Sequence, residues 1–178
     1  MGSHAEETPW ASRGCSVPTL AETGQTFDAG EPRHRNRKNV TPDEFVDRFN
    51  RLLSWEDRYR YLIQLGRKLE PYPEEHRDRD HLVPGCLSQV WLVSLGGSDD
   101  GRLQLRADSD AHIVKGLISV LFMMYADKTA EEILAADIEG IFERLDLGQH
   151  LSVNRRNGFY SMNQKIRERA VEQLAVES

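Results

Sequence analysis

The sequence predicts one α+β domain in which a small antiparallel β-sheet packs against about five helices. The run Leu87–Leu95 is rich in apolar and β-branched residues, and residues 102–107 alternate polar and apolar side chains after a glycine-containing turn at 96–101. Helix-start signals occur on both sides of this hairpin. A chain of 178 residues has room for one such domain with a real core, and is too short for two comfortable ones.

Two helices are expected before the hairpin, because capping residues mark their starts. Thr41 precedes a proline and stands three residues before Glu44, which is the pattern of a capping box, and apolar residues recur at helical spacing as far as Leu53. Ser54 marks a second start. We expect these two helices to form a short antiparallel hairpin, and the charged, proline-containing residues 70–84 to form a long loop.

An apolar helix is expected directly after the β-hairpin and should end near Tyr125. The acidic and hydroxyl side chains of residues 108–110 stand where its N-cap should be. Residues 113–125 are the longest strongly apolar stretch, but Lys115, Gly116 and Ser119 interrupt it. The stretch therefore predicts a buried helix and no membrane span.

Three more helices are expected in the last third of the chain. Thr129 with Glu132 forms another capping box, and Asp137 starts a further helix that Gly148 is well placed to end. After a connecting segment, apolar residues at helical spacing between 159 and 174 predict a terminal amphipathic helix.

Residues 1–40 predict a disordered tail, and residues 41–178 the folded domain. The tail has no sustained hydrophobic period, and Gly, Pro, Ser and Thr recur in it. Its first residues lack the basic and apolar regions of a signal peptide, so we expect a cytoplasmic protein. Of the two cysteines, Cys15 lies in the tail and Cys86 in the domain, which argues against a structural disulfide and predicts a free Cys86 thiol.

The charge distribution argues against nucleic acid as a partner. The formal net charge is −6, and because the tail carries five acidic and five basic residues, the whole excess belongs to the domain. An acidic domain repels the phosphate backbone. The basic residues within 33–38 are typical of a solvated linker.

Cys86 is the main candidate for chemistry, since it follows Pro84 and Gly85 on a turn directly before a strand. Most free cysteines are small buried hydrophobes, and an inert Cys86 in an interaction domain is the simplest interpretation. A thiol that carries a group needs a mobile loop and a docking surface, but no catalytic triad. Free cysteine has a pKa of about 8.5, which the helix after Asp110 or the guanidinium of Arg155 could lower.

Two further interpretations require particular side chains next to Cys86. A cysteine hydrolase would need His81, His112 or His150 as its base, and no oxyanion-type motif surrounds the thiol. A zinc site could include Cys86, but the sequence has no CxxC or HxxxH spacing to support one. The possible further ligands are His76, Asp80, His81, Asp108, Asp110 and His112.

Four segments in series resemble the SufE family of sulfur acceptors. They are Trp55–Gly66 (WEDRYRYLIQLG), Val83–Trp91 (VPGCLSQVW), Ala107–Ile118 (ADSDAHIVKGLI) and His150–Gly158 (HLSVNRRNG). Their order and spacing match throughout, and the resemblance covers about residues 41–175. Four motifs in the same order are a specific sign of the family, whereas any one of them alone would be weak evidence.

The resemblance implies a fold shared with IscU-type iron–sulfur scaffolds, no cofactor in the chain itself, and a PLP-dependent cysteine desulfurase of the SufS or CsdA type as partner. Cys86 would accept persulfide sulfur, stimulate that enzyme and pass the sulfur to an iron–sulfur scaffold of the SufBCD type. The chain would then be a sulfurtransferase-type carrier and desulfurase activator rather than a stand-alone enzyme.

The resemblance also implies roles for residues around Cys86. Arg155 matches the family arginine near the active loop and would stabilise thiolate or persulfide charge. Asp110 and Lys115 match positions beside the cysteine loop, and Asp110 is the candidate for loop support. In the family the cysteine loop is sheltered at rest. A carrier gains by keeping Cys86 against apolar side chains and by moving the loop out only when it is docked.

Overall fold

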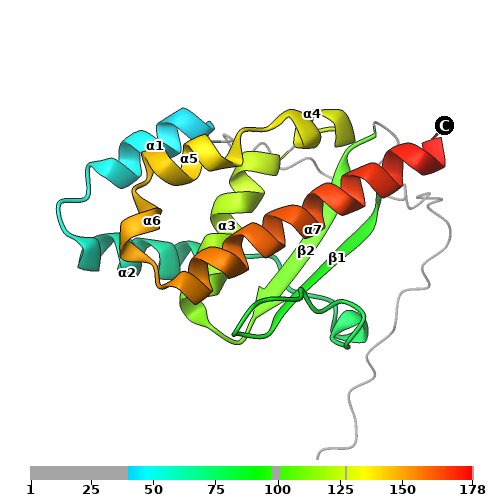
Figure 1. The fold of residues 1–178 in the computed structure, drawn as a ribbon, viewed down its shortest axis with the longest axis horizontal. Helices are drawn as coiled ribbons and strands as arrows, with labels where there is room; N and C mark the ends of the chain where they lie inside the picture. The colour runs from blue at the N-terminus through cyan, green and yellow to red at the C-terminus, as the bar shows by residue number, and fades with distance from the viewer. Residues whose placement is uncertain (1–39, 98–100, 127, 178) are drawn as a thin grey trace, which may run out of the picture. The chain divides into compact units, whose positions relative to one another are not determined.

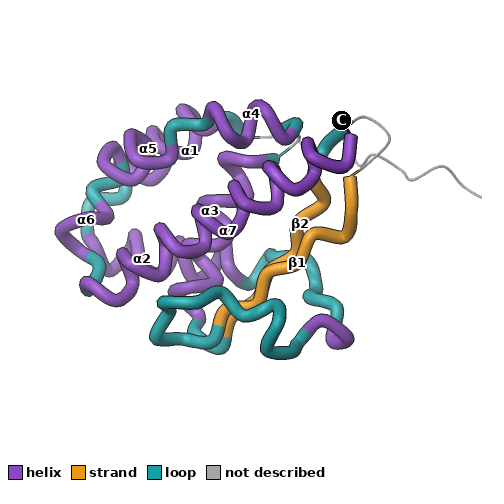
Figure 2. The backbone as a smooth tube through the Cα atoms, turned by 45° about the vertical axis from the view of Figure 1, so that its right-hand side comes forward, coloured by secondary structure: helices purple, strands orange, loops and turns teal. Residues whose placement is uncertain are grey.

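The computed structural model describes residues 40–97, 101–126 and 128–177. Within these residues seven α-helices accompany one two-stranded antiparallel sheet, which confirms the α+β prediction (Figures 1 and 2). About five helices were expected, and six of the seven had start signals or apolar patterns of their own in the sequence. The predicted disordered tail, Cys15 included, lies outside the described residues apart from Val40. No helix in the described part of the chain is long and apolar enough to cross a membrane.

The elements follow one another along the chain with short connections, apart from the segment around the 3-10 helix η1. Their bounds are α1 Pro42–Asn50, α2 Trp55–Gly66, η1 Glu74–His76, β1 Val90–Gly97, β2 Leu103–Ser109, α3 His112–Tyr125, α4 Ala130–Ala135, α5 Ile138–Arg144, α6 Leu147–His150 and α7 Val153–Glu177.

The predicted β-hairpin is confirmed, with a register that pairs Val90 with Ser109 and Trp91 with Asp108. Its first strand begins at Val90 instead of Leu87, because the residues before Val90 belong to the loop that carries Cys86. The predicted long loop 70–84 is partly wrong. It contains η1, and its end pairs with β1 through an isolated antiparallel bridge between Leu82 and Trp91.

The core lies between the sheet and helices α2, α3 and α7. Helix α3 packs against α2, β2 and α7, and α7 also packs against α4 and β1 (Figure 1). The predicted pairing of α1 with α2 includes ring contacts, such as Phe49 against Trp55, and the Arg58 guanidinium over the Phe49 ring, but α2 packs more extensively along α3. Leu53, predicted to extend the apolar stripe of α1, is fully exposed in the connection between α1 and α2.

Four of the predicted helix starts are confirmed by hydrogen bonds. Thr41 and Thr129 form complete capping boxes, while the side chains of Ser54 and Asp137 accept from the backbone N–H three residues on. Each of these caps depends only on residues close in sequence, which is why the sequence predicts them.

Three predicted helix boundaries are wrong. The N-cap of α3 is Ala111, which has no side-chain cap, because Asp108 lies within β2 and pairs with other side chains. Gly148 does not end α5, which stops at Arg144; it lies inside the separate helix α6. Helix α7 begins at Val153, within the segment expected to be a connection.

The crossing of α2 and α3 depends on two glycines. A Cβ on Gly116 would lie 2.5 Å from the carbonyl oxygen of Leu62, and a Cβ on Gly66 would lie 2.7 Å from the backbone nitrogen of Gly116. Both separations are far below van der Waals contact, and the obstacles are backbone atoms that cannot rotate away. The two helices therefore pack at a distance that only glycine permits.

Replacing Gly116 by alanine should force α2 and α3 apart and lower the free energy of unfolding by about 1–3 kcal/mol, as overpacking does in other cores. Urea unfolding followed by circular dichroism measures this loss. Gly148→Ala is the matched control, since its Cβ would meet Phe142 at an ordinary 3.6 Å. The control should keep or slightly raise stability, because alanine is the better helix residue. Equal stability of the two variants would show that the crossing of α2 and α3 does not require glycine at residue 116.

Candidate functional site

Cys86 lies at the tip of a short loop, residues 84–89, that turns the chain back into β1. The loop is closed at its base by the backbone N–H of Val83, which donates to the carbonyl of Val90 at 2.8 Å. Gly85 has a φ of 78°, a left-handed conformation that side chains rarely adopt, and a Cβ there would lie 3.1 Å from Ser161 Oγ. The glycine thus lets the loop reverse its direction directly before Cys86 and close to α7.

The thiol of Cys86 is half-buried against the backbone of α7. Its Sγ lies 3.7 Å from the carbonyl oxygen of Gly158, with the geometry of a weak S–H donor. A Cβ on Gly158 would lie 3.3 Å from this sulfur. The absence of a side chain at residue 158 therefore makes room for the thiol.

A cavity of about 280 Å³ surrounds the thiol. Its lining residues come from the cysteine loop and β1, from α3, and from the start of α7 with the residue before it: Leu87, Ser88, Val90, Val114, Leu117, Ser152, Asn154, Arg155, Gly158 and Met162. The members from α3 and β1, together with Met162, are buried and apolar, while Asn154 and Arg155 are exposed. The cavity thus has an apolar interior and a polar rim.

Burial raises the pKa of the Cys86 thiol above its ordinary value. Removing the thiol from water disfavours its charged form, so the thiol is protonated in this conformation at neutral pH. A protonated thiol is a poor nucleophile. The geometry therefore describes a sheltered sulfur that must be moved or newly solvated before it can react.

The structure places Arg155 at the cavity that holds Cys86, while its role in the chemistry stays a prediction. Arg155 lies in the first turn of α7 and lines the same cavity, with an exposed side chain. The positive end of the α7 dipole borders the same cavity, because Asn154 and Arg155 belong to this turn. From the sequence, the helix start expected near Cys86 was the one after Asp110, because the segment from Val153 was not recognised as helical.

Asp110 lies beside the end of the cysteine loop and contacts it through its backbone. Its N–H donates to the carbonyl oxygen of Gln89 at 3.3 Å, while its side chain is exposed. The hydroxyl of Ser109 donates to the same carbonyl at 2.8 Å and is buried. Ser109 was missed by sequence reasoning, because a serine among aspartates suggested only a helix cap. The role of the Asp110 carboxylate stays a prediction.

The candidate bases of a hydrolase do not line the cavity around Cys86. Nδ1 of His81 lies 2.7 Å from Asp78, His150 stacks on Trp55 with ring centroids 3.6 Å apart, and His112 is exposed. None of the described residues that line the Cys86 cavity is a histidine. The geometry gives the thiol no base within this cavity.

The possible zinc ligands do not come together as a site, although the rings of His76 and His81 are neighbours with centroids 4.7 Å apart. Among residues 40–97, 101–126 and 128–177, no three Cys, His, Asp or Glu side chains are grouped so that they could hold a metal ion. Asp108 faces Arg77 and Lys115, at 2.7 and 2.6 Å.

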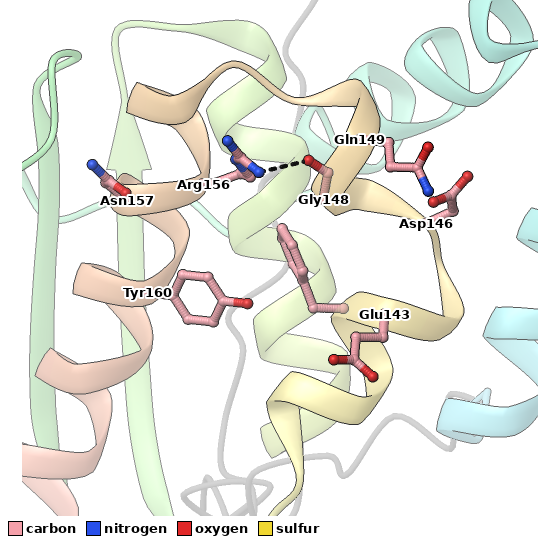
Figure 3. Close-up of a pocket in the computed structure, with 8 residues that line it drawn as sticks. Glu143, Asp146, Gly148, Gln149, Arg156, Asn157 and Tyr160 are labelled. Atoms are coloured by element: carbon pink, nitrogen blue, oxygen red, sulfur yellow. Dashed lines mark hydrogen bonds between the residues drawn. The ribbon is translucent and has the colours of Figure 1, made fainter.

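A second and larger cleft of about 520 Å³ lies between α5, α6 and α7 (Figure 3). Arg156 crosses it and donates to the carbonyl of Gly148 at 2.9 Å, and the rings of Phe142 and Tyr160 meet at 5.2 Å. At 100° per residue, Arg156 and Tyr160 are on the side of α7 opposite Gly158. This cleft is therefore separate from the cavity around Cys86.

Comparison with known proteins agrees with the motifs in the sequence. The family model of SufE, described as an Fe-S metabolism associated domain, matches residues 43–170. The chain belongs to the SufE family. An uncharacterised SufE-like protein of Rhizobium meliloti (strain 1021) is 43% identical over 130 residues, which cover 72% of this chain and 93% of the relative. A second, from Rhizobium etli, is 45% identical over 130 residues, which cover 72% of this chain and 88% of the relative.

The fold is shared more widely than the sequence. The solution structure of a hypothetical protein from Thermus thermophilus superimposes with a TM-score of 0.62 at 17% identity, covering 75% of this chain and 96% of that one. Membership of the SufE family assigns the chain to iron–sulfur metabolism. Both the SufE resemblance and the α+β fold class expected from the sequence are thereby confirmed.

Replacing Gly158 by alanine should crowd the Cys86 sulfur, which would have to shift by a few tenths of an ångström, and so weaken the closed position of the loop. If the added methyl group destabilises the closed loop by about 1 kcal/mol, the alkylation rate with iodoacetamide should rise about fivefold. The pH at half-maximal rate should fall, because an exposed thiol loses the burial that raises its pKa. Gly148→Ala, in the second cleft, should leave both values unchanged. An unaltered alkylation rate in Gly158→Ala would show that the contact does not hold the loop.

Proposed function

We propose that the chain is a sulfur acceptor that takes persulfide sulfur from a PLP-dependent cysteine desulfurase, of the SufS or CsdA type, onto Cys86. The observation that carries this proposal is the placement of the thiol in a SufE domain. Cys86 is on a short loop, is sheltered in a cavity large enough for a further sulfur atom, and has no neighbouring histidine base in the described lining. A sulfur carrier must protect its persulfide at rest and present it to the next protein. The cavity around Cys86 supplies the protection.

The proposed reaction transfers one sulfur atom without net oxidation or reduction. The Cys86 thiolate attacks the outer sulfur of the donor persulfide, a new S–S bond forms, and the S–S bond of the donor breaks. The donor cysteine leaves as a thiolate and takes up the proton that Cys86 has lost. Cys86–SH and donor–S–SH thus become Cys86–S–SH and donor–SH, and removal of its product stimulates the desulfurase.

Shelter protects the product of this reaction. A persulfide in bulk solvent is open to reduction and to further oxidation, whereas the apolar interior of the cavity shields part of the sulfur from water. The same burial keeps the thiol protonated, so sulfur transfer requires the loop to leave the cavity. We expect docking of the desulfurase to drive this step.

The surface around the cavity suits a protein partner. Leu87, the residue after Cys86, is 82% exposed, and Val153 at the start of α7 is 58% exposed. Exposed apolar side chains beside a reactive group are typical of docking surfaces. Arg155 adds a positive charge at the same rim, where it would support the thiolate or the persulfide. Asp110, next to the loop end, is proposed to support the loop.

The sulfur would pass to an iron–sulfur scaffold of the SufBCD type in the cytoplasm, and the carrier itself would need no cofactor.

The first test is transfer of sulfur to a defined residue. Incubation with a cysteine desulfurase and cysteine should add about 32 Da, one sulfur atom, to Cys86 in the intact-protein mass spectrum. Cys86→Ser should remain unmodified and should not stimulate the desulfurase. Cys15→Ser is the matched control, since it removes the other cysteine of the chain and should still accept sulfur on Cys86. Full stimulation by Cys86→Ser would refute the proposal.

The second test concerns Arg155. Arg155→Gln should lower the rate of sulfur transfer at saturating desulfurase by about threefold to tenfold, because the Cys86 thiolate and persulfide lose a stabilising positive charge at the rim of the cavity. The difference from the unaltered protein should shrink at high salt, since the side chain is exposed. Arg48→Gln, an exposed arginine of α1, is the control with the same charge change. Equal transfer rates in both variants would remove Arg155 from the mechanism.

A further inference from the structure

The segment before the cysteine loop, residues 72–83, forms an arm that covers one side of the β-hairpin. Figure 2 shows η1 and the loops around it next to the strands. Tyr72 of the arm packs with Trp91 and Val93 of β1 in a small apolar cluster separate from the main core, and Leu82 packs against it. The arm therefore connects the hairpin directly to the loop that carries Cys86.

The backbone pairing between the arm and β1 is short. It consists of the Val83 N–H bond to Val90 and a bond from the Leu92 N–H to the carbonyl of His81 at 2.9 Å, around the bridge of Leu82 with Trp91. Two hydrogen bonds in a pairing of three residues are marginal on their own. Other contacts must keep the arm in place.

Arg77 supplies the strongest of these contacts. Its guanidinium donates to Asp108 at 2.7 Å and to Glu74 at 3.0 and 3.2 Å. The same group lies over the Trp91 ring, 4.6 Å from the centroid, and 5.6 Å from that of Tyr72. Charge-assisted bonds and cation–π contacts thus converge on one side chain of the arm.

Asp108 joins this arginine to the rest of the domain. Its second carboxylate oxygen lies 2.6 Å from Nζ of Lys115 in the first turn of α3. Burial alone would raise the pKa of Asp108, but hydrogen bonds from Lys115 and Arg77 outweigh it and hold the pKa below its usual range. The side chains of Arg77 and Asp108 are only 29% and 18% exposed, so solvent screens their ion pair weakly.

We propose that Arg77, Asp108 and Lys115 form a clamp of positioning residues that limits the mobile segment to residues 84–89. This inference rests on the proposed sulfur transfer. With the clamp closed, the base of the loop is fixed at Val83 and Val90, and only six residues carry Cys86 to the donor. With the clamp open, the arm detaches back to Tyr72, and residues 73–89 become one flexible loop of 17 residues.

The length of the mobile segment sets the cost of presenting the thiol. The probability that a flexible loop holds a given geometry falls with about the 3/2 power of its length, so lengthening from six to 17 residues lowers it roughly fivefold. A longer loop also leaves its cavity more often. The clamp therefore predicts opposite changes in two rates: Cys86 becomes easier to alkylate, and sulfur transfer becomes slower.

Arg77→Met tests this directly, because methionine keeps an apolar stem over Trp91 and removes the charge. In the isolated protein, alkylation of Cys86 and amide hydrogen exchange at Val83 and Leu92 should each accelerate at least threefold. At saturating desulfurase, the rate of sulfur transfer should fall by about threefold to fivefold. Arg77→Lys, which can still pair with Asp108, should restore most of the transfer rate. Lys115→Met should change both rates in the same directions as Arg77→Met but by less.

Arg144→Met is the matched control, since it removes an ion pair of 2.8 Å to Asp43 that does not involve the arm. It should leave alkylation and transfer unchanged. Unchanged alkylation in Arg77→Met would overturn the clamp, and faster alkylation with undiminished transfer would overturn its positioning role. Failure of the unaltered protein to accept sulfur would instead refute the proposed function, while the alkylation and exchange measurements would still decide whether the clamp exists.

Discussion

The contact between the Cys86 thiol and the backbone of α7 is the constraint on which the rest of the site depends. It is possible because Gly158 has no side chain, and because Gly85 adopts the left-handed conformation that turns the loop toward α7. This contact buries half of the thiol and thereby raises its pKa, and the first turn of α7 lies at the rim of the same cavity. The absence of side chains at Gly85 and Gly158 thus allows the half-buried resting position of the Cys86 thiol.

Patterns of residues close in sequence predicted much of the fold. They failed where contacts between distant residues determine the local structure. Thr41, Ser54, Thr129 and Asp137 were recognised as helix caps because a cap needs only the next three residues. Asp108 also looked like a cap, yet it pairs with Trp91 within the hairpin, and its side-chain partner Arg77 is 31 residues away. The α+β class survived these errors, because it depends on the hairpin and on the presence of helices rather than on their bounds.

The candidate site was predictable only in part, and for a similar reason. Spacing singled out Cys86 from its own neighbours, but nothing in spacing connected it to Arg155, which the resemblance to SufE supplied. The serine that binds the loop end, Ser109, carried no recognisable signal. Its importance depends on the carbonyl of Gln89, which the hairpin brings next to it only after folding.

The two ends of the cysteine loop and its tip are held by forces of different strength, and this difference determines which part moves. The tip is held by one weak S–H contact at 3.7 Å and by burial of a small thiol, together of the order of 1–2 kcal/mol. The base is held by backbone hydrogen bonds and by charge-assisted bonds of 2.6 and 2.7 Å around Asp108. A docking protein that covers Leu87 and offers the sulfur a new environment therefore has to offset only the weaker contacts of the tip. The tip can leave the cavity while the base of the loop stays fixed.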